Sequence, residues 1–238
     1  MDKEQRWLPV LAPQLPLPIP TPVAQGEPDE RYPYRWSVYR WLEGSLAARA
    51  PIADPVAFAT DLAGFLRALE AVDSTGGPEP GQHNFFRGGP LAHYEREALE
   101  AIERLGGEIP RAAVQRTWAD AMASEWERDP VWFHGDVAAG NLLVRLGRLA
   151  AVLDFGSSGV GDPACDMAIA WTFLSGAARE RFRAERGIDA ATWSRGRGWT
   201  LWKSLITMVG ALEDDDDEAV AACRREIDVI TADFAAER

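Results

Sequence analysis

The sequence is poor in cysteine and in long apolar runs, and each shortage excludes a class of protein. Its 238 residues contain two cysteines, Cys165 and Cys223, which are too few for a disulfide framework and lack the spacing of a zinc site. We expect both thiols to be reduced. No apolar run approaches the ~20 residues that cross a bilayer, and the first residues lack the apolar stretch of a secretory signal. The sequence therefore predicts a cytoplasmic protein without a membrane partner.

Lysine is almost absent as well. Lys3 and Lys203 are the only lysines among 25 basic residues, so a mechanism that needs a lysine must use one of them. The 37 acidic residues give a net charge of −12, which argues against nucleic acid as a partner because phosphate binding needs a basic face. This balance is more compatible with a cationic or metal-bound ligand.

The hydrophobic pattern predicts an α+β fold that is mainly helical. Helices are expected at 2–11, from 54 to about 70, at 93–105, at 110–127, and from 163 to the end, and the aromatic residues between 193 and 202 recur at the spacing of a helix core. Short apolar runs predict strands at 36–42, 132–133, 142–144 and 149–155. Proline at every second position from 16 to 22 predicts an extended connection.

The chemistry is concentrated between residues 132 and 166. Asp136 and Asp154 each follow an apolar, strand-like run, and Asn141 lies between them. Carboxylate and amide oxygens are hard ligands that suit Mg²⁺ better than zinc, copper or iron. Three such donors are too few for a closed cage, so water and a substrate phosphate would complete the octahedron.

The pattern His-Gly-Asp-x-x-x-x-Asn followed by Asp-Phe-Gly has the spacing of a kinase catalytic loop and its metal-binding motif. Here the chain resembles the aminoglycoside phosphotransferase family of small-molecule kinases, which share the protein-kinase-like fold. The segments WSVYRWLEG, FRGGPLAHY, FHGDVAAGNLLV and VLDFGSSGVGDPACDMA follow the family's order, and the resemblance covers essentially the whole chain.

The resemblance implies roles for the catalytic loop. Asp136 would orient and deprotonate a substrate hydroxyl, and His134, the other residue of the catalytic set, would brace the loop from behind. Asn141 and Asp154 would hold Mg²⁺ against the phosphates of ATP or GTP. Two further carboxylates, those of Asp162 and Asp166, would accept hydrogen bonds that organise the loops.

The resemblance also implies a nucleotide site near the N-terminus. Backbone groups of Arg40 and Leu42 would meet the adenine edge, and Glu4 matches the family's helical glutamate. The family pattern includes a Gly-rich loop and a strand lysine before this helix, but no glycine precedes Gly26, and Lys3 is the immediate neighbour of Glu4. We expect the Lys3 side chain to point around the helix from Glu4 rather than to pair with it.

We therefore expect residues 1–43 to be a remnant of the N-terminal lobe with its hinge strand, and residues 44–238 to be the helical C-terminal catalytic lobe. The shortened lobe has three explanations: a misassigned start or truncated gene, a homo-oligomer that covers the gap, or a degenerate relative without catalysis. We expect weak rather than efficient activity, because one lost electrostatic donor typically costs ~3 kcal/mol of transition-state stabilisation.

The predicted function is transfer of a γ-phosphate to a hydroxyl of a small polar molecule, with a cationic molecule as one option. One alternative is a non-catalytic protein that binds a nucleotide or a partner, and another is a metal-dependent phosphohydrolase that uses Asp136 and Asp154. The acidic run 214–217 is interpreted as a solvated turn, with a cation-attracting rim as the alternative.

Overall fold

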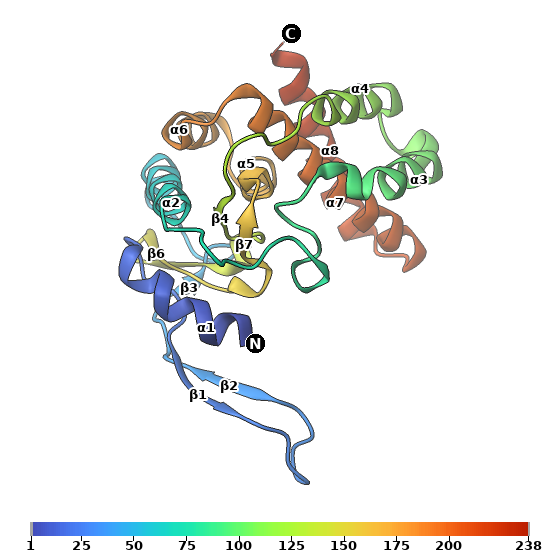
Figure 1. Cartoon of the computed structure of the whole chain (residues 1–238). Coiled ribbons are helices and arrows are strands. Elements are labelled where there is room, and N and C mark those ends of the chain that lie inside the picture. Colours follow the sequence, from blue (N-terminus) through green and yellow to red (C-terminus); the bar gives the residue numbers. More distant parts are fainter. Residues whose placement is uncertain (1, 238) are drawn as a thin grey trace.

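The computed structural model describes residues 2–237, and in it a helical body carries a thin N-terminal extension (Figure 1). The helices are α1 (Asp2–Leu11), α2 (Pro55–Glu70), α3 (Glu95–Leu105), α4 (Arg111–Met122), α5 (Ile169–Thr172), α6 (Gly176–Arg186), α7 (Ala190–Glu213) and α8 (Asp217–Ala236). The strands are β1 (Pro22–Gly26), β2 (Trp36–Tyr39), β3 (Ser45–Leu46), β4 (Val131–Phe133), β5 (Leu142–Arg145), β6 (Arg148–Val152) and β7 (Gly159–Gly161). None of these helices has the length and hydropathy to cross a bilayer within the described residues. The predicted α+β class is confirmed.

Most helices start and stop where the sequence signals indicate. The side chain of Asp54 caps α2 by accepting hydrogen bonds from the N–H groups of Val56 and Ala57, and Pro55 occupies the first turn. Two predicted boundaries were wrong. The helix expected at 110–127 ends at Met122, and the one expected from His93 begins with a 3-10 turn before α3 starts at Glu95.

The strands form three small antiparallel sheets, in the orders β1-β2, β3-β5-β6 and β4-β7. The predicted hairpin of β5 and β6 is confirmed, with Leu142 opposite Val152. The strand expected at 36–42 is shorter, since β2 ends at Tyr39. Strand β7 was not predicted because it is glycine-rich. Its Gly161 is needed for close packing, since an added Cβ would lie 2.3 Å from the carbonyl oxygen of Gly88.

The N-terminal segment is held on the body by α1 and by the proline-rich connection that follows it. Leu8 and Leu11 of α1 are buried, and the ring of Trp7 meets that of Trp132 edge to face at 5.0 Å. The N–H of Val152 in β6 donates to the carbonyl of Pro18 at 3.1 Å. From there the β1–β2 hairpin projects away from the body (Figure 1).

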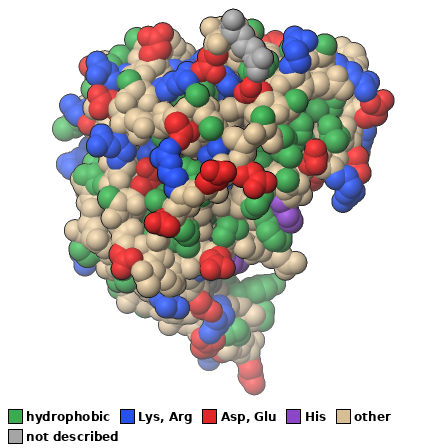
Figure 2. All heavy atoms as spheres, turned by 45° about the horizontal axis from the view of Figure 1, so that its top comes forward, with side chains coloured by type: hydrophobic (Ala, Val, Ile, Leu, Met, Phe, Trp, Pro, Cys, Tyr) green, Lys and Arg blue, Asp and Glu red, His purple; other side chains and the backbone are tan. Residues whose placement is uncertain are grey.

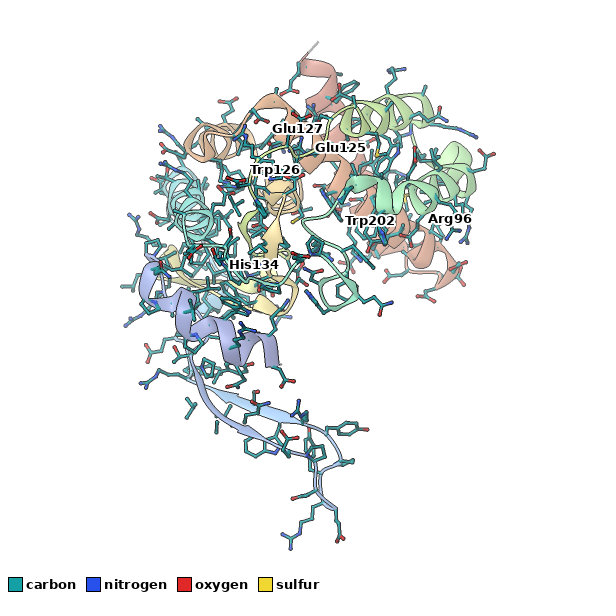
Figure 3. All side chains as sticks on the ribbon, in the orientation of Figure 1. Arg96, Glu125, Trp126, Glu127, His134 and Trp202 are labelled. Carbon is teal, nitrogen blue, oxygen red and sulfur yellow. The ribbon has the colours of Figure 1, made fainter. Side chains whose placement is uncertain are left out.

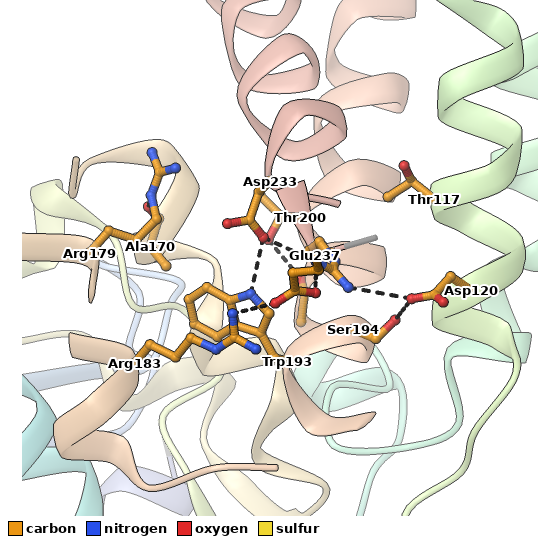
Figure 4. A network of polar contacts seen from close by, with 12 residues as sticks. Thr117, Asp120, Ala170, Arg179, Arg183, Trp193, Ser194, Thr200, Asp233 and Glu237 are labelled. Carbon is orange, nitrogen blue, oxygen red and sulfur yellow. Dashed lines mark hydrogen bonds and ion pairs between the residues drawn. The ribbon is translucent and has the colours of Figure 1, made fainter. Parts of the chain in front are cut away.

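A buried arginine joins three helices in the body. Arg197 of α7 is 2% exposed and pairs with Asp120 of α4 and with Asp233 and Glu237 at the end of α8. The indole N–H of Trp193 also donates to Asp233, as Figure 4 shows. Because the ion pairs share one guanidinium inside the helical layer, they fix α4, α7 and α8 relative to one another.

Candidate active site

The loop after β4 is held by a buried carboxylate. The N–H groups of His134 and Gly135 donate to the two oxygens of Asp166 at 2.8 and 2.7 Å. Burial raises the pKa of Asp166, while the hydrogen bonds from the two N–H groups act in the opposite direction. Gly135 has a φ of +83°, and a Cβ there would lie 2.4 Å from the carbonyl oxygen of Ser157. The loop therefore needs glycine at 135 and an acceptor at 166, and the prediction that Asp166 accepts hydrogen bonds is confirmed.

His134 is fully buried and lies at the junction of the loop and the β6 end (Figure 3). Its Nε2 is 2.8 Å from the carbonyl oxygen of Leu153, and its Nδ1 accepts the N–H of Asp136 at 3.2 Å. These two contacts require a neutral ring with the proton on Nε2. Both ring nitrogens are thus engaged with backbone, which is the geometry of a brace rather than of a group that touches substrate.

Asp136 and Asn141 lie side by side. The Asn141 amide Nδ2 donates to both the main-chain oxygen and Oδ2 of Asp136, at 2.9 Å each. Because the amide nitrogen faces Asp136, the Oδ1 of Asn141 is directed away from it. The Oδ1 of Asp136 accepts no hydrogen bond within the described residues, so it is open to a further donor.

Asp154 is brought next to Asn141 by the β5–β6 ladder. The N–H of Leu153 donates to the carbonyl of Asn141 at 2.7 Å, which places the following residue beside the asparagine. Asp154 has a φ of +59°, a left-handed conformation that is rare outside glycine. Its Oδ1 accepts the N–H of Gly156 at 3.2 Å, and its side chain is exposed. These contacts place the backbone of Asp154 beside that of Asn141, whose side chain contacts Asp136.

These donors fit a hard divalent cation in an open site. Asn141 Oδ1 and Asp154 Oδ2 are oxygen atoms without a protein hydrogen bond in the described part of the chain. Residues 2–237 contain no group of three or more His, Cys, Asp or Glu side chains that could hold a metal ion. Two protein oxygens leave most positions of an octahedron to water and phosphate, which is how Mg²⁺ is commonly held with a nucleotide.

Lys3 reaches the loop that follows Asp154, which the sequence analysis did not foresee. Its Nζ donates to the carbonyls of Gly156 and Ser158 at 2.6 and 2.7 Å. Burial lowers its pKa to about 8, although Glu4 and Asp154 favour the charged form. The contact joins residues more than 150 positions apart, so no local pattern could have indicated it.

A cleft of about 540 Å³ lies between the N-terminal segment and the β5–β6 hairpin of the body. Its walls are formed by Glu4, Pro20, the segment 39–42, Gly44, Leu46, Leu143 and Leu153. The predicted residues Glu4, Arg40 and Leu42 thus share one mostly apolar cleft. The N–H of Arg40 already donates to the carbonyl of Thr21 at 2.8 Å, so it cannot serve a ligand, whereas no described backbone hydrogen bond uses Leu42. Tyr39 donates its hydroxyl to Glu4 at 3.3 Å, which fixes the glutamate at the cleft wall.

A second cavity, of about 410 Å³, begins at Asp136 and extends between α7 and α8. Trp199 and Trp202 of α7 form part of its wall, and Trp202 is labelled in Figure 3. The aromatic residues expected in the helix core are therefore of two kinds. Trp193 is core, as predicted, while Trp199 and Trp202 are buried but also border a cavity.

Fold and site together define a small-molecule kinase of the protein-kinase-like type: a helical lobe with a catalytic loop, and a nucleotide-sized cleft beside it. The model of the phosphotransferase enzyme family matches residues 1–199, and the chain belongs to that family. No curated protein sequence matches the chain significantly.

Solved structures of phosphotransferases share the fold. A structure of APH(2″)-IIia with GDP and kanamycin superposes with a TM-score of 0.68 at 19% identity, over 98% of this chain and 82% of that one. A thermostable mutant of aminoglycoside phosphotransferase APH(4)-Ia with AMP-PNP and hygromycin B gives 0.66 at 20% identity, over 98% and 83%. The macrolide 2′-phosphotransferase MphH from Brachybacterium faecium gives 0.55 at 22% identity, over 94% and 78%. The resemblance to the aminoglycoside phosphotransferase family and the kinase-like fold are confirmed.

Proposed function

We propose that this protein transfers the γ-phosphoryl group of ATP or GTP to a hydroxyl group of a small molecule, with Mg²⁺ as cofactor. The observation that carries the proposal is the position of Asp136, Asn141 and Asp154 in one cluster, with an apolar cleft at the hinge segment and a second cavity at Asp136. Residues 1–43 would supply part of the nucleotide cleft, and residues 44–238 the catalytic lobe.

The chain's own groups suit each part of this reaction. The open Oδ1 of Asp136 can accept the hydrogen of an alcohol, whose oxygen then bonds to the γ-phosphorus as the bond from that phosphorus to the bridging oxygen breaks and the nucleoside diphosphate leaves. Asn141 keeps the other oxygen of Asp136 occupied and so fixes its orientation. Asn141 and Asp154 would hold the Mg²⁺, which, when bound, neutralises charge on the phosphates. His134 positions the loop without touching the reactants.

The nucleotide is supported by the cleft and by the relatives. A mostly apolar cleft with unengaged backbone groups at Leu42 suits the face and edge of a purine. The related structures hold GDP in one case and AMP-PNP in another, so both purines are candidates. A cytoplasmic location and a homo-oligomer both stay predictions from the sequence.

Calorimetric titration of ATP and GTP, with and without Mg²⁺, tests the nucleotide site. We expect Mg²⁺-dependent binding that falls at least about tenfold in Asp154→Asn, a substitution that tolerates the left-handed backbone but removes the charge. Asp215→Asn is the matched control, because Asp215 is also an exposed aspartate with positive φ (54°). Failure of the folded protein to bind either nucleotide would overturn the proposal.

Acceptor-dependent product formation separates this function from the alternatives. A kinase forms nucleoside diphosphate in proportion to added hydroxyl compound and releases no free phosphate, whereas a phosphohydrolase releases phosphate without an acceptor. Binding without either product would support the non-catalytic alternative.

A further inference from the structure

The cavity that begins at Asp136 has a charge pattern that bears on the substrate, and this inference rests on the proposed function. Four of the side chains that border the cavity carry charge when ionised: Asp136, Glu226, Arg87 and Lys203. If Asp136 is reserved for the reacting hydroxyl, two cations and one anion are left to meet the rest of the substrate.

The two cations form no ion pair within residues 2–237. Arg87 is half-buried and Lys203 is exposed at the cavity border, whereas the buried Arg195 pairs with Asp162. The guanidinium of Arg87 lies 5.7 Å from the ring centre of Phe85, a contact that leaves its charge uncompensated. Cationic groups that border a cavity without a counter-ion are available to an anion.

The remaining acid has one oxygen in use. Glu226 Oε2 accepts the hydroxyl of Ser204 at 2.8 Å, and the carboxylate keeps its charge. Both cysteines border the cavity as well, and burial raises the pKa of each thiol, so they stay neutral and add no negative charge. Apart from Asp136, a substrate with several ammonium groups would therefore find one carboxylate and two repelling cations.

Most of the rest of the wall is apolar and includes Trp199 and Trp202, which are 4% and 5% exposed, although four hydroxyl side chains also line it: Thr172, Thr200, Ser204 and Thr207. The ring of Trp202 stacks on Tyr94 at 3.8 Å, and its indole N–H donates to Glu97 at 2.7 Å. Glu97 is outside the cavity lining, so the polar edge of this indole is satisfied elsewhere and its ring is fixed. Trp199 meets Trp202 edge to face at 5.7 Å. A rigid aromatic surface of this kind favours an apolar, planar substrate body.

The acidic run between α7 and α8 does not reverse this balance. Residues 214–217 are exposed, and none of them borders the cavity. The side chain of Asp216 caps α8 by accepting the N–H of Ala219. On the face shown in Figure 2, acidic and basic side chains are interspersed, so no continuous acidic field covers that side. We therefore infer the charge of the substrate from the charged side chains that border the cavity.

We propose that the phosphate acceptor is a hydroxyl compound with a flat apolar body and an anionic group, held by Arg87 and Lys203, rather than a polycationic amino sugar. The hydroxyl would lie at Asp136 and the anionic group toward Lys203, with the body against Trp199 and Trp202.

A matched series of three acceptors tests the proposal. The probes are 6-hydroxymethyl-2-naphthoate, 2-hydroxymethyl-6-methylnaphthalene and 2-aminomethyl-6-hydroxymethylnaphthalene, with kanamycin as the polycation. Binding is measured by calorimetry and transfer by nucleoside diphosphate formation. We expect the carboxylate probe to bind at least about tenfold more tightly than the methyl probe, and the ammonium probe to bind most weakly of the three.

Reversing the charge of Lys203 shows whether this residue causes the preference for the carboxylate probe. In Lys203→Glu we expect the carboxylate probe to lose about tenfold in affinity, the ammonium probe to gain, and the methyl probe to change little. Arg225→Glu is the control, because Arg225 is exposed on the same helix, α8, as Glu226 and does not border the cavity. Arg87→Gln should also lower the affinity for the carboxylate probe more than the affinities for the methyl and ammonium probes.

The outcomes separate this proposal from the proposed function. Preference for kanamycin or the ammonium probe, equal affinity for all three naphthalenes, no binding, or a preference that Lys203→Glu leaves unchanged would each overturn the anionic-acceptor proposal. If the methyl probe or kanamycin is phosphorylated best, the kinase function stands and only the substrate class fails. If the carboxylate probe binds in a Lys203-dependent manner but is not phosphorylated, the cavity chemistry holds and the failure belongs to the phosphotransferase proposal.

Discussion

Aromatic residues are buried in the body of this protein but exposed in and beside its N-terminal hairpin. Trp132 and Trp193 in the body are at most 1% exposed, whereas Trp36 and Trp41 in or next to the hairpin are 40% and 83% exposed. The body encloses its side chains between helices on several sides, while the two-stranded ribbon contacts α1 through Glu4 and Gln5 but fully buries none of the residues of β1 and β2. The packing that stabilises this chain therefore resides in the body.

The residues of the proposed site are also divided between the body and the N-terminal segment. Asp136, Asn141 and Asp154 all belong to the body, on loops fixed by buried contacts. The proposed nucleotide cleft instead spans both regions, since Leu143 and Leu153 line it from the body and Tyr39 from the hairpin strand. The proposed catalytic groups should therefore depend on the body alone, and nucleotide affinity on how the N-terminal segment sits against the body.

The largest effect is expected at the centre of the body site. Asp136→Asn should lower the turnover of the best acceptor by about 10²- to 10⁴-fold, because an amide cannot take the proton of the hydroxyl. Nucleotide affinity should be retained, since the asparagine oxygen can still accept the Asn141 amide. Steady-state kinetics and calorimetry on the same preparations, with Asp215→Asn as the control, measure both. Unchanged turnover would remove Asp136 from the mechanism.

The contrast in packing predicts the next largest effect. Leu62 of α2 is fully buried, and Leu62→Ala should lower the free energy of unfolding by about 2–5 kcal/mol. Val23 of β1 is 63% exposed, and Val23→Ala should change the free energy of unfolding by less than about 0.5 kcal/mol. Denaturant titrations of both variants make the comparison. Equal losses at the two positions would show that the hairpin is packed against something in solution.

Sequence reasoning performed best where structure is encoded locally. The structure confirms three features that follow from neighbouring residues. They are the N-cap at Asp54, the helical spacing of the apolar residues in α2, and the β5–β6 hairpin. The contact between Asp136 and Asn141 is local as well, because the two residues lie five positions apart within HGD-x-x-x-x-N; their catalytic roles stay predictions from the family resemblance.

Contacts between distant segments could not be predicted in the same way. Strand β7 follows no β pattern and pairs with β4 only because glycine permits the close approach. Backbone groups of Arg40 were expected to meet the adenine edge, yet its N–H donates to the carbonyl of Thr21. Arg87 and Lys203, the two cations that border the cavity at Asp136, come from segments more than a hundred residues apart. Such features depend on tertiary packing rather than on propensity.

A smaller effect is expected at Lys3, where the two regions meet. Burial lowers its pKa in the folded protein to about 8, below the ordinary lysine pKa of 10.5. Between these values the unfolded chain holds more protons than the folded one, so the Lys3 contribution to stability rises with pH from about 8 to about 10. Below pH 8 the contribution is at its lowest, because the folded state then keeps a partly desolvated charge.

Comparison with Lys3→Met isolates this contribution. The raised pKa values of Tyr39 and Cys223 act in the opposite direction at high pH, since ionisation of these groups favours the unfolded chain. Both groups are present in the two proteins, so the difference between their denaturation midpoints should change in favour of wild type as pH rises from 8 to 10. A constant difference would mean that Lys3 is solvated and does not clamp the loop after Asp154.

The smallest effect should come from the ion pairs of Arg35, one within the hairpin to Glu27 and one to Asp2 of α1. Arg35 contacts Glu27 and Asp2 at 2.6 and 2.7 Å, but all three side chains are largely exposed, where water and salt weaken such pairs. Arg35→Ala should leave the global denaturation midpoint unchanged. Hydrogen exchange should nevertheless quicken at β1 and β2 amides, including the Arg40 N–H, because the ribbon opens locally without unfolding the body. If the midpoint fell as far as in Leu62→Ala, the hairpin would belong to the same cooperative unit as the body, and the division between the two regions would be lost.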